Sequence, residues 1–280
     1  MNLKYSQENQ SKMTSKIICI HSNDTEISKQ TKKELLAKLI NAGYIVEDEL
    51  SEKTELLICI GGDGVILDAL HRFNFPRVPV IGVNTGHLGF FQEVESHTLD
   101  AFIKNYREGR YRLQPLSTVE GIVTFTDGST IVINALNEIV IRGNNYLASH
   151  LELSIDGSFI EKFSGDGLLV ATSAGSTAYN YSLGGSIVDP RLDLLQVTPL
   201  APMNTTAYRS FTSSILLPPD LHLDVVPDLT RCEKISIVAD GECSVLSNVA
   251  NIKVGVSDIE VNLLRFETYD FWNKVKTKFL

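Results

Sequence analysis

The spacing of apolar residues changes near Leu113-Gln114-Pro115, and this change constrains the fold more than any other feature of the sequence. Before it, short apolar runs alternate with segments in which apolar residues recur every three or four positions, as over 27–40. Strands that alternate with helices are typical of an open, largely parallel α/β sheet. After it, over 117–172, short alternating runs are separated by tight turns, which predicts antiparallel strands. The sequence therefore predicts an α/β domain followed by an all-β domain.

The domain boundaries follow from the same change. A chain of 280 residues suits one large domain or two of modest size. The polar segment 1–15 is expected to be disordered or an extra N-terminal extension. We predict the α/β domain over 16–113, completed by the C-terminal tail 262–280, and the all-β domain over 114–261.

The first helix of the α/β domain has recognisable ends. Asn23 or Asp24 is predicted to cap its N-terminus, and Gly43 follows its last turn. The apolar spacing places Ile27, Thr31, Leu35 or Leu36, and Leu39 or Ile40 on one face of this helix.

Charge and hydropathy exclude several kinds of partner. The chain has 34 acidic and 25 basic residues, a net charge of −9, which argues against nucleic acid. The apolar run Leu56–Ile60 is about a quarter of the ~20 residues that a membrane-spanning helix needs. Because the N-terminus also lacks the apolar core of a signal peptide, we expect a cytoplasmic protein without a membrane segment.

The cysteines do not predict a metal site. Cys19 and Cys59 lie in apolar, strand-like runs, where a free thiol behaves as a small hydrophobe. Cys232 and Cys243 lack the closely spaced Cys and His partners that zinc requires. We expect buried, reduced thiols and no metal held by the protein alone.

The motif Gly61-Gly62-Asp63-Gly64 comes directly after the run Leu56–Ile60 and before a helical segment. In an open parallel sheet, ligands bind beyond the carboxyl ends of the strands, and glycines there let phosphate approach the backbone. A carboxylate would repel bare phosphate, so Asp63 suits the proton of a hydroxyl group or a metal ion. No Lys-Ser or Lys-Thr pair follows, so the motif is not a P-loop. The alternative is an ordinary Asp-Gly turn.

Five Asp-Gly pairs occur in the chain, and their surroundings distinguish turns from candidate sites. Asp127-Gly128 and Asp156-Gly157 each join two alternating runs, which predicts hairpin turns. Asp63-Gly64 links a strand to a helix, and Asp166-Gly167 is preceded by a further glycine that a hairpin does not need, so both are candidates for function. Asp240-Gly241 fits a turn and a site equally well.

Two more segments carry polar residues where a ligand could bind. In the loop Gly82–Phe90, Asn84 would either orient a ribose or close the loop through its own backbone. Asn137-Glu138 interrupts the run 130–141, which is predicted as one strand. Because both side chains need partners when buried, they either bind vicinal hydroxyls, where the strand ends or bulges, or lie in water at a strand edge.

The segment 174–182 combines small residues with hydroxyl groups. Ser176 or Thr177 is a plausible helix N-cap, and Ala178 leaves space for a ligand. Tyr179 would either stack on a base or join the core.

Together these motifs resemble the NAD kinase family in order and approximate spacing, over most of the chain from about 16 to about 240. The first motif alone is unspecific, since lipid kinases and phosphofructokinases carry similar ones, but the set of five is specific. The resemblance implies an α/β domain and a β-sandwich domain, with NAD bound between them and in contact with a neighbouring subunit of a homotetramer. The five motifs are Gly61–Gly64, Gly82–Phe90, Asn137-Glu138, Gly165–Gly167 and Gly175–Tyr179.

The resemblance also implies a reaction. ATP or polyphosphate, with Mg²⁺, would phosphorylate the 2′-hydroxyl of the adenosine ribose of NAD to give NADP, and Asp63 would take the hydroxyl proton. Asp166 would reach the nicotinamide side, and Asp240 would lie near the phosphates. The other nucleotide-binding candidates are Gly61, Gly62, Gly64, Asn84, Phe90, Asn137, Glu138, Thr177, Ala178, Tyr179 and Ser182.

The chain departs from the family pattern at three positions. Val65 stands where Thr is common, Ser173 where Pro is usual, and Ser164 where a basic residue is common.

Two other functions share part of the pattern. A lipid or sphingoid kinase has the same first motif but needs an apolar groove or amphipathic membrane helix, which is not recognisable here. A nucleotide sensor would bind NAD without consuming ATP, and its Asp63 would be dispensable.

Overall fold

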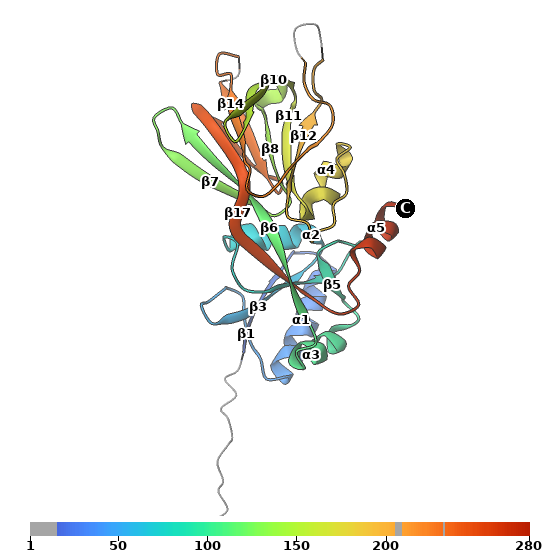
Figure 1. Cartoon of the computed structure of the whole chain (residues 1–280). Coiled ribbons are helices and arrows are strands. Elements are labelled where there is room, and N and C mark those ends of the chain that lie inside the picture. The colour runs from blue at the N-terminus through green and yellow to red at the C-terminus, as the bar shows by residue number, and fades with distance from the viewer. Residues whose placement is uncertain (1–15, 205–208, 232) are drawn as a thin grey trace, which may run out of the picture. The chain divides into compact units, whose positions relative to one another are not determined.

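The computed structural model describes residues 16–204, 209–231 and 233–280, and the segment 1–15 predicted as an N-terminal extension lies outside them. The chain divides into two compact units (Figure 1). The first, the α/β unit, contains residues 16–73 of the described chain together with 78–112 and 264–280. The second, the β unit, contains 74–77 and 113–263. A parallel sheet with helices in one unit and antiparallel sheets in the other confirm the predicted fold class.

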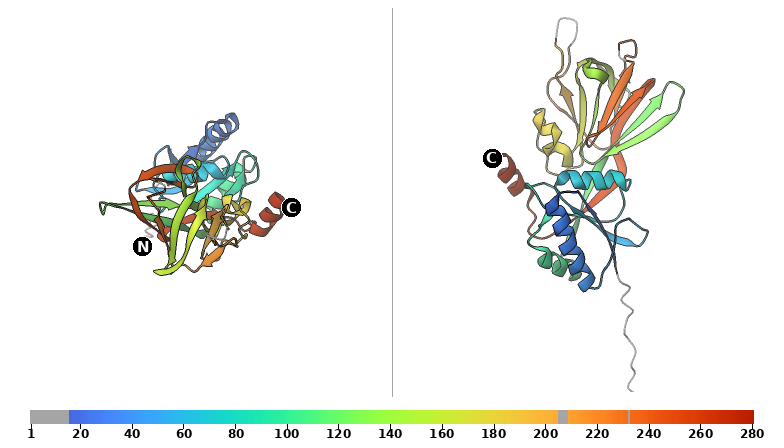
Figure 2. Two further views of the ribbon diagram at one scale, coloured as in Figure 1. Left: turned by 90° about the horizontal axis from the view of Figure 1, so that it is seen from above. Right: turned by 180° about the vertical axis from the view of Figure 1, so that it is seen from behind.

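Five parallel strands form the sheet of the α/β unit, in the spatial order β2-β1-β3-β4-β5. The central strands β3 and β4 are buried on both faces, which explains their nearly continuous apolar sequences. Helix α1 packs on β1, β2 and β3, and α3 packs on β5 (Figure 2). The bounds are β1 (Ile17–Ser22), β2 (Ile45–Glu47), β3 (Thr54–Ile60), β4 (Val80–Asn84), β5 (Gln92–Glu95), α1 (Glu26–Asn41), α2 (Asp63–Arg72), α3 (Leu99–Arg107) and α5 (Phe271–Phe279).

The predicted N-cap of α1 is wrong, and its predicted apolar face is right in part. The N-cap is Thr25 rather than Asn23 or Asp24, because the Thr25 hydroxyl accepts the hydrogen bond from the backbone of the first turn. Three members of the predicted face are buried, but the buried stripe is rotated away from Ile27 and Ile40, which are exposed. That buried stripe consists of Ser28, Thr31, Leu35 and Leu39.

The antiparallel strands of the β unit form two layers. In the first, the strands run β10-β9-β14-β17, and β6 pairs with β17 and β7; its members are β6 (Arg112–Phe125), β7 (Thr130–Ala135), β9 (Ser149–Ile155), β10 (Ser158–Gly165), β14 (Leu223–Pro227) and β17 (Val249–Arg265). In the second, the order is β13-β12-β11-β8-β15-β16; its members are β8 (Glu138–Gly143), β11 (Gly167–Thr172), β12 (Leu195–Leu200), β13 (Ile215–Leu217), β15 (Lys234–Ala239) and β16 (Glu242–Ser247). The short helices are η1 (Asn144–Tyr146), η2 (Ala174–Thr177) and α4 (Tyr179–Ser182).

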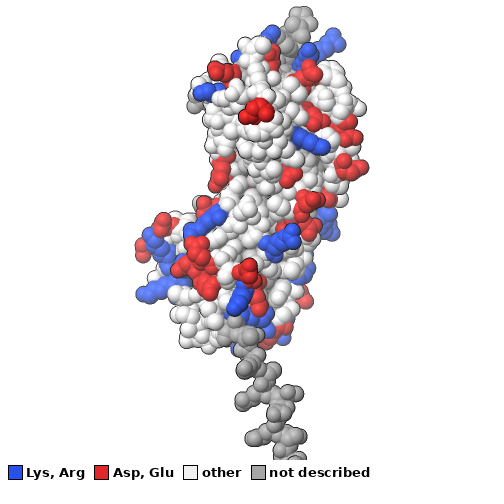
Figure 3. Space-filling view, turned by 90° about the vertical axis from the view of Figure 1, so that its left-hand side faces the viewer, with Lys and Arg blue, Asp and Glu red and all other residues white. Residues whose placement is uncertain are grey.

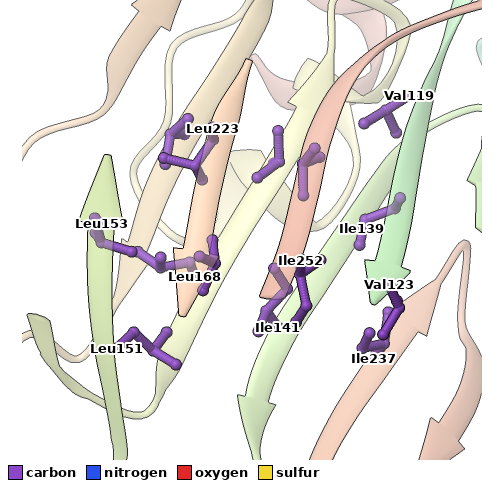
Figure 4. Close-up of a cluster of buried hydrophobic side chains, with 14 of the residues drawn as sticks. Val119, Val123, Ile139, Ile141, Leu151, Leu153, Leu168, Leu223, Ile237 and Ile252 are labelled. Atoms are coloured by element: carbon purple, nitrogen blue, oxygen red, sulfur yellow. The ribbon is translucent and has the colours of Figure 1, made fainter. Parts of the chain in front are cut away.

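Apolar side chains from both sheets form the core of the β unit (Figure 4). They recur at every second position, as Leu151 and Leu153 do on β9 and Ile139 and Ile141 on β8. Burial of alternate residues is the expected pattern for two sheets that pack face to face.

Tight turns account for much of this topology. Asp156-Gly157 joins β9 to β10 with positive φ at both residues, and Asp240-Gly241 joins β15 to β16 in the same way. Asp127-Gly128 lies between β6 and β7, so the two predicted hairpins are confirmed. The prediction of one strand over 130–141 is wrong, because the chain leaves β7 after Ala135 and enters a different sheet as β8.

The surface carries charges of both signs, intermixed on the face shown in Figure 3. Among the described residues, no helix is long and apolar enough to cross a membrane. Cys19 and Cys59 are buried as predicted, whereas Cys243 is exposed on the edge strand β16, where its side chain points away from the core. Cys232 lies outside the described residues.

Candidate functional site

The first candidate region lies at the carboxyl ends of the strands of the α/β unit. Strand β3 ends at Ile60, and α2 begins three residues later at Asp63, with Gly62 as an N-cap that has no side chain to close the first helical turn. Open space lies where a Cβ would extend from Gly62 or Gly64. The strand order 2-1-3-4-5 is that of doubly wound folds, in which ligands bind at this edge of the sheet.

Asp63 joins the first two sequence motifs. Its carboxylate oxygens accept hydrogen bonds from the backbone N–H groups of Phe90 and Phe91, each at 2.9 Å. Gly89 lies so close that a Cβ at this position would come within 2.4 Å of Asp63 Oδ1, which explains why the loop needs glycine here. The Asp63 side chain remains 26% exposed, so its carboxylate is both fixed in place and accessible.

Asn84 closes the second loop through its own backbone. Its Oδ1 accepts a hydrogen bond from Gly86 N at 3.0 Å, and its Nδ2 lies 3.3 Å from a carboxylate oxygen of Glu95. Of the two alternatives, loop closure is therefore the one that the structure contains.

The second candidate region lies in the β unit, where β7 ends and β8 begins. Asn137 and Glu138 are buried at this break, 7% and 8% exposed. The Asp240 carboxylate accepts hydrogen bonds from the backbone N–H groups of Leu136 and Asn137, both at 2.7 Å. Asp240 is therefore both a turn residue and the acceptor that holds the strand break open.

Two buried oxygen atoms in this region have no hydrogen-bond partner among the described residues, Asn137 Oδ1 and Glu138 Oε2. Burial, with a smaller contribution from the charge of Asp240, raises the pKa of Glu138 to about 8. Unpaired buried acceptors are rare in folded proteins because each costs free energy. A ligand with hydroxyl groups, which both donate and accept, would supply the missing partners.

The third segment packs directly against this break. A Cβ on Gly175 would lie 2.0 Å from the carbonyl oxygen of Asn137, so only glycine allows this approach. Thr172 Oγ1 donates to Leu136 O at 2.7 Å and accepts from Gly175 N at 3.1 Å. These contacts place η2 and α4 beside Asn137-Glu138, with Thr177, Ala178, Tyr179 and Ser182 on the same short helical segment.

The predicted capping role of Ser176 or Thr177 is wrong. The N-cap of α4 is Ala178, which makes no side-chain cap. Ser176 is buried, and its hydroxyl bonds the backbone of Val188 instead, donating to the carbonyl oxygen at 3.2 Å and accepting from the N–H at 3.0 Å.

Sequence reasoning missed Asn180, which is fully buried beneath the third segment. Its Oδ1 accepts a hydrogen bond from Thr198 at 2.7 Å, and its Nδ2 lies within 3.4 Å of Ser176 O and 3.5 Å of Ser186 O. The available signal was an amide inside a segment already singled out, but its shortest hydrogen bond is to Thr198, which belongs to a later strand.

The β unit does not bring Asp166 to the other candidates. Asp166 directly precedes β11, whose register pairs Gly167 with Arg142 and Ala171 with Glu138. Five strand residues at about 3.4 Å each place Asp166 roughly 17 Å from the level of Glu138. Its side chain is exposed at that far end.

Comparison with known proteins agrees with these features. Residues 1–111 match the model of the ATP-NAD kinase N-terminal domain, and residues 136–266 match that of the ATP-NAD kinase C-terminal domain. An NAD kinase from Finegoldia magna is 38% identical over 269 residues, which cover 95% of this chain and 98% of the relative.

Solved structures share the fold. A yeast NADH kinase complexed with NADH has a TM-score of 0.82 at 22% identity, over 95% of this chain and 87% of that one. An NAD kinase from Archaeoglobus fulgidus in complex with ATP has a TM-score of 0.70 at 23% identity, over 93% and 99%. With both domain models and a full-length relative in agreement, the chain belongs to the ATP-NAD kinase family.

Proposed function

We propose that this chain is an NAD kinase that transfers a phosphoryl group from ATP to the 2′-hydroxyl of the adenosine ribose of NAD, giving NADP. Membership of the ATP-NAD kinase family supports NAD as the acceptor and ATP as the donor. The structural observation that carries the proposal is the pair of unpaired buried acceptors, Asn137 Oδ1 and Glu138 Oε2. Vicinal ribose hydroxyls both donate and accept, so they can bond the Asn137 amide oxygen and the Glu138 carboxyl.

We assign the proton transfer to Asp63. Its carboxylate is accessible and held by two backbone N–H groups, so little reorganisation is needed to meet a hydroxyl group. The 2′-oxygen attacks the γ-phosphorus as its proton passes to Asp63, and the bond from phosphorus to the ADP oxygen breaks. General base catalysis of this kind contributes about 10² to 10⁴ in rate.

The glycines beside Asp63 are assigned to the phosphates. Gly62 and Gly64 leave open space at the start of α2, and Gly61 connects this turn to β3. The donor enters as the Mg²⁺ complex of ATP, in which the metal offsets phosphate charge that a chain of net charge −9 would otherwise repel.

The remaining candidates surround the nucleotide. We assign Asn137 and Glu138 to ribose hydroxyls, and Tyr179, which is partly exposed, to stacking on a base. Asp240 acts by positioning, since its carboxylate bonds the backbone of the strand break. Asn84 and Phe90 shape the loop around Asp63. We assign Asp166 to the nicotinamide side of NAD. The residues assigned to the lining of the nucleotide site are Thr177, Ala178 and Ser182.

We further propose that the protein is a cytoplasmic homotetramer and that polyphosphate is an alternative donor. Supply of ATP fits a cytoplasmic location. Light scattering coupled to gel filtration measures the oligomeric state, and replacement of ATP by polyphosphate tests the donor.

One assay separates this function from its rivals. The purified full chain is incubated with NAD, ATP and Mg²⁺, and NADP is measured with an NADP-specific dehydrogenase. An NAD kinase forms NADP in proportion to the ATP consumed. A lipid kinase would instead phosphorylate diacylglycerol in vesicles, and a sensor would bind NAD without consuming ATP; either result would contradict the proposal.

A further inference from the structure

The C-terminal helix α5 is anchored on the loop that holds Asp63. The rings of Phe271 and Phe279 both contact the ring of Phe90, with centroid separations of 5.8 and 5.7 Å. The Lys274 ammonium donates hydrogen bonds to the carbonyl oxygens of Gly89 and Gln92. Contacts at both ends and in the middle of the helix therefore attach it to this loop.

Lys278 extends from this anchored helix toward Asp63. Its Nζ lies 3.9 Å from Asp63 Oδ2 and 4.9 Å from the centroid of the Phe90 ring. The distance to Asp63 is longer than a hydrogen bond, and the Lys278 side chain is 37% exposed. The ammonium group is thus held near the carboxylate by charge and retains hydrogen-bonding capacity for another group.

Two other cations act on Asp63 electrostatically, but they are already engaged. Arg265 is buried and donates to the carbonyl oxygens of Phe90 and Phe91 as well as to Glu93. Lys274 is bonded to the two loop carbonyls described above. Of these three cations, Lys278 is the one whose side chain is exposed rather than buried or half-buried.

We propose that Lys278 is a catalytic residue that binds the oxygens of the phosphoryl group during its transfer. The inference rests on the proposed role of Asp63. A 2′-oxygen within hydrogen-bond distance of Asp63 has the attacked phosphorus about 3 Å away, so phosphoryl oxygens come within roughly 4–6 Å of the carboxylate. A four-carbon side chain whose ammonium already lies 3.9 Å from that carboxylate reaches them by a change of rotamer.

Lys278 keeps its proton throughout the reaction. The proton of the 2′-hydroxyl passes to Asp63, the new bond forms between the 2′-oxygen and phosphorus, and ADP leaves with the electrons of the broken bond. The ammonium group offsets charge on the transferring oxygens, which is the main protein contribution to phosphoryl transfer.

Three variants of the full chain test this role. K278A removes the charge, K278R retains it, and K276A is the matched control, because Lys276 is exposed two positions earlier on the same helix and points about 200° away. We expect K278A to lower kcat at least about 10-fold and K278R to recover most of that loss. K276A should stay within about twofold of the wild type.

Binding of a non-hydrolysable ATP analogue, measured by calorimetry with Mg²⁺, provides a readout apart from turnover. K278A should weaken this binding several-fold, while the affinity for NAD alone stays within about twofold. If Lys278 only anchored the helix, K278A would displace α5 and change the environment of the tryptophan on it. Trp272, the single tryptophan of the chain, lies on α5 and packs against Phe271, whose ring contacts Phe90 of the Asp63 loop, so its emission reports whether the helix stays in place.

The outcomes distinguish this inference from the proposed function. If the wild type forms no NADP, the proposed function fails. If the wild type is active but K278A retains kcat and analogue affinity within twofold, the role of Lys278 fails. It also fails if K278A shifts the Trp272 emission and K278R does not restore turnover, because the lysine would then support the helix rather than the phosphoryl group.

Discussion

At the scale of single residues, Asp63 serves the architecture and the chemistry with the same carboxylate. Both oxygens accept hydrogen bonds from the loop Gly86–Phe91, and part of the side chain remains accessible. The sequence predicted a carboxylate at a strand end from the order strand, glycines, helix. It did not predict the hydrogen bonds from the backbone N–H groups of Phe90 and Phe91, because those residues follow a different strand.

Asp63→Asn should lower kcat by at least about 100-fold, while NAD affinity stays within several-fold. The amide cannot take the hydroxyl proton, and its nitrogen cannot accept the hydrogen bond from one of the two loop N–H groups. Steady-state kinetics and NAD binding measure the two effects separately. Asp127→Asn, in a hairpin Asp-Gly pair, is the control, and near-normal turnover in D63N would remove Asp63 from the mechanism.

Glu138 should make stability depend on pH. Its pKa is raised from 4.5 to about 8, mainly by burial, so between these values the folded chain holds a proton that the unfolded chain has lost. This contribution to stability is present below pH 4.5 and is lost as the pH rises through about 8. Glu138→Gln removes the titration, so its Tm relative to the wild type should be higher at pH 9 than at pH 5.

Thermal unfolding at the two pH values measures this difference, with Glu260→Gln at an exposed position as the control. An E138Q variant whose Tm difference from the wild type does not change with pH would show that Glu138 is ionised in the folded chain.

At the scale of elements, the sequence predicted which Asp-Gly pairs form turns. It did not predict the hydrogen bonds that the same side chains make to distant segments. Asp156-Gly157 and Asp240-Gly241 adopt the same two-residue turn, with φ of 47° and 48° at the aspartates. The sequence left Asp240 open between a turn and a site. In the structure, Asp240 is a turn residue and also belongs to the candidate site. Its carboxylate accepts hydrogen bonds from the N–H groups of Leu136 and Asn137, about a hundred positions earlier.

Asp240→Asn should therefore destabilise the β unit more than Asp156→Asn, because the carboxylate of Asp156 is exposed and pairs, among the described residues, only with His222. Asparagine tolerates the positive φ of both turns, so the turns themselves are preserved. At position 240 the amide can accept only one of the two strong hydrogen bonds, which leaves a buried N–H unpaired at a cost of about 1–3 kcal/mol. Denaturant unfolding measures both variants. Equal losses of unfolding free energy in D240N and D156N would show that the hydrogen bonds from Leu136 and Asn137 to Asp240 contribute nothing to stability.

At the scale of the whole molecule, the change of pattern near residue 113 was enough to predict two classes of domain in the right order. Fewer of the residues that form the candidate sites could be predicted from the sequence. The break at Asn137 followed from the cost of burying polar groups, but the contributions of Asn180, Lys274 and Lys278 depend on contacts between distant segments. The C-terminal tail was expected to join the first domain, yet its mixed sequence did not indicate which loop it would meet.

The position of Asp166 leads to a prediction about assembly. It is exposed at the end of β11 that lies opposite Glu138, so we expect it to contact a nucleotide that is bound by a second copy of the chain. D63N and D166N should each form nearly inactive assemblies alone. Mixed assemblies should recover up to about a quarter of wild-type kcat, since random pairing leaves one intact site in half of the pairs.

Co-expression of the two variants with different affinity tags, followed by tandem purification and NADP measurement, tests this. Mixed assemblies that stay inactive while keeping the wild-type mass would show that Asp63 and Asp166 act within one subunit. If D166N alone is fully active, Asp166 makes no essential contact with the nucleotide from either subunit. Recovery of activity on mixing requires that each site draw the two aspartates from different chains, because no other combination of these variants contains both carboxylates.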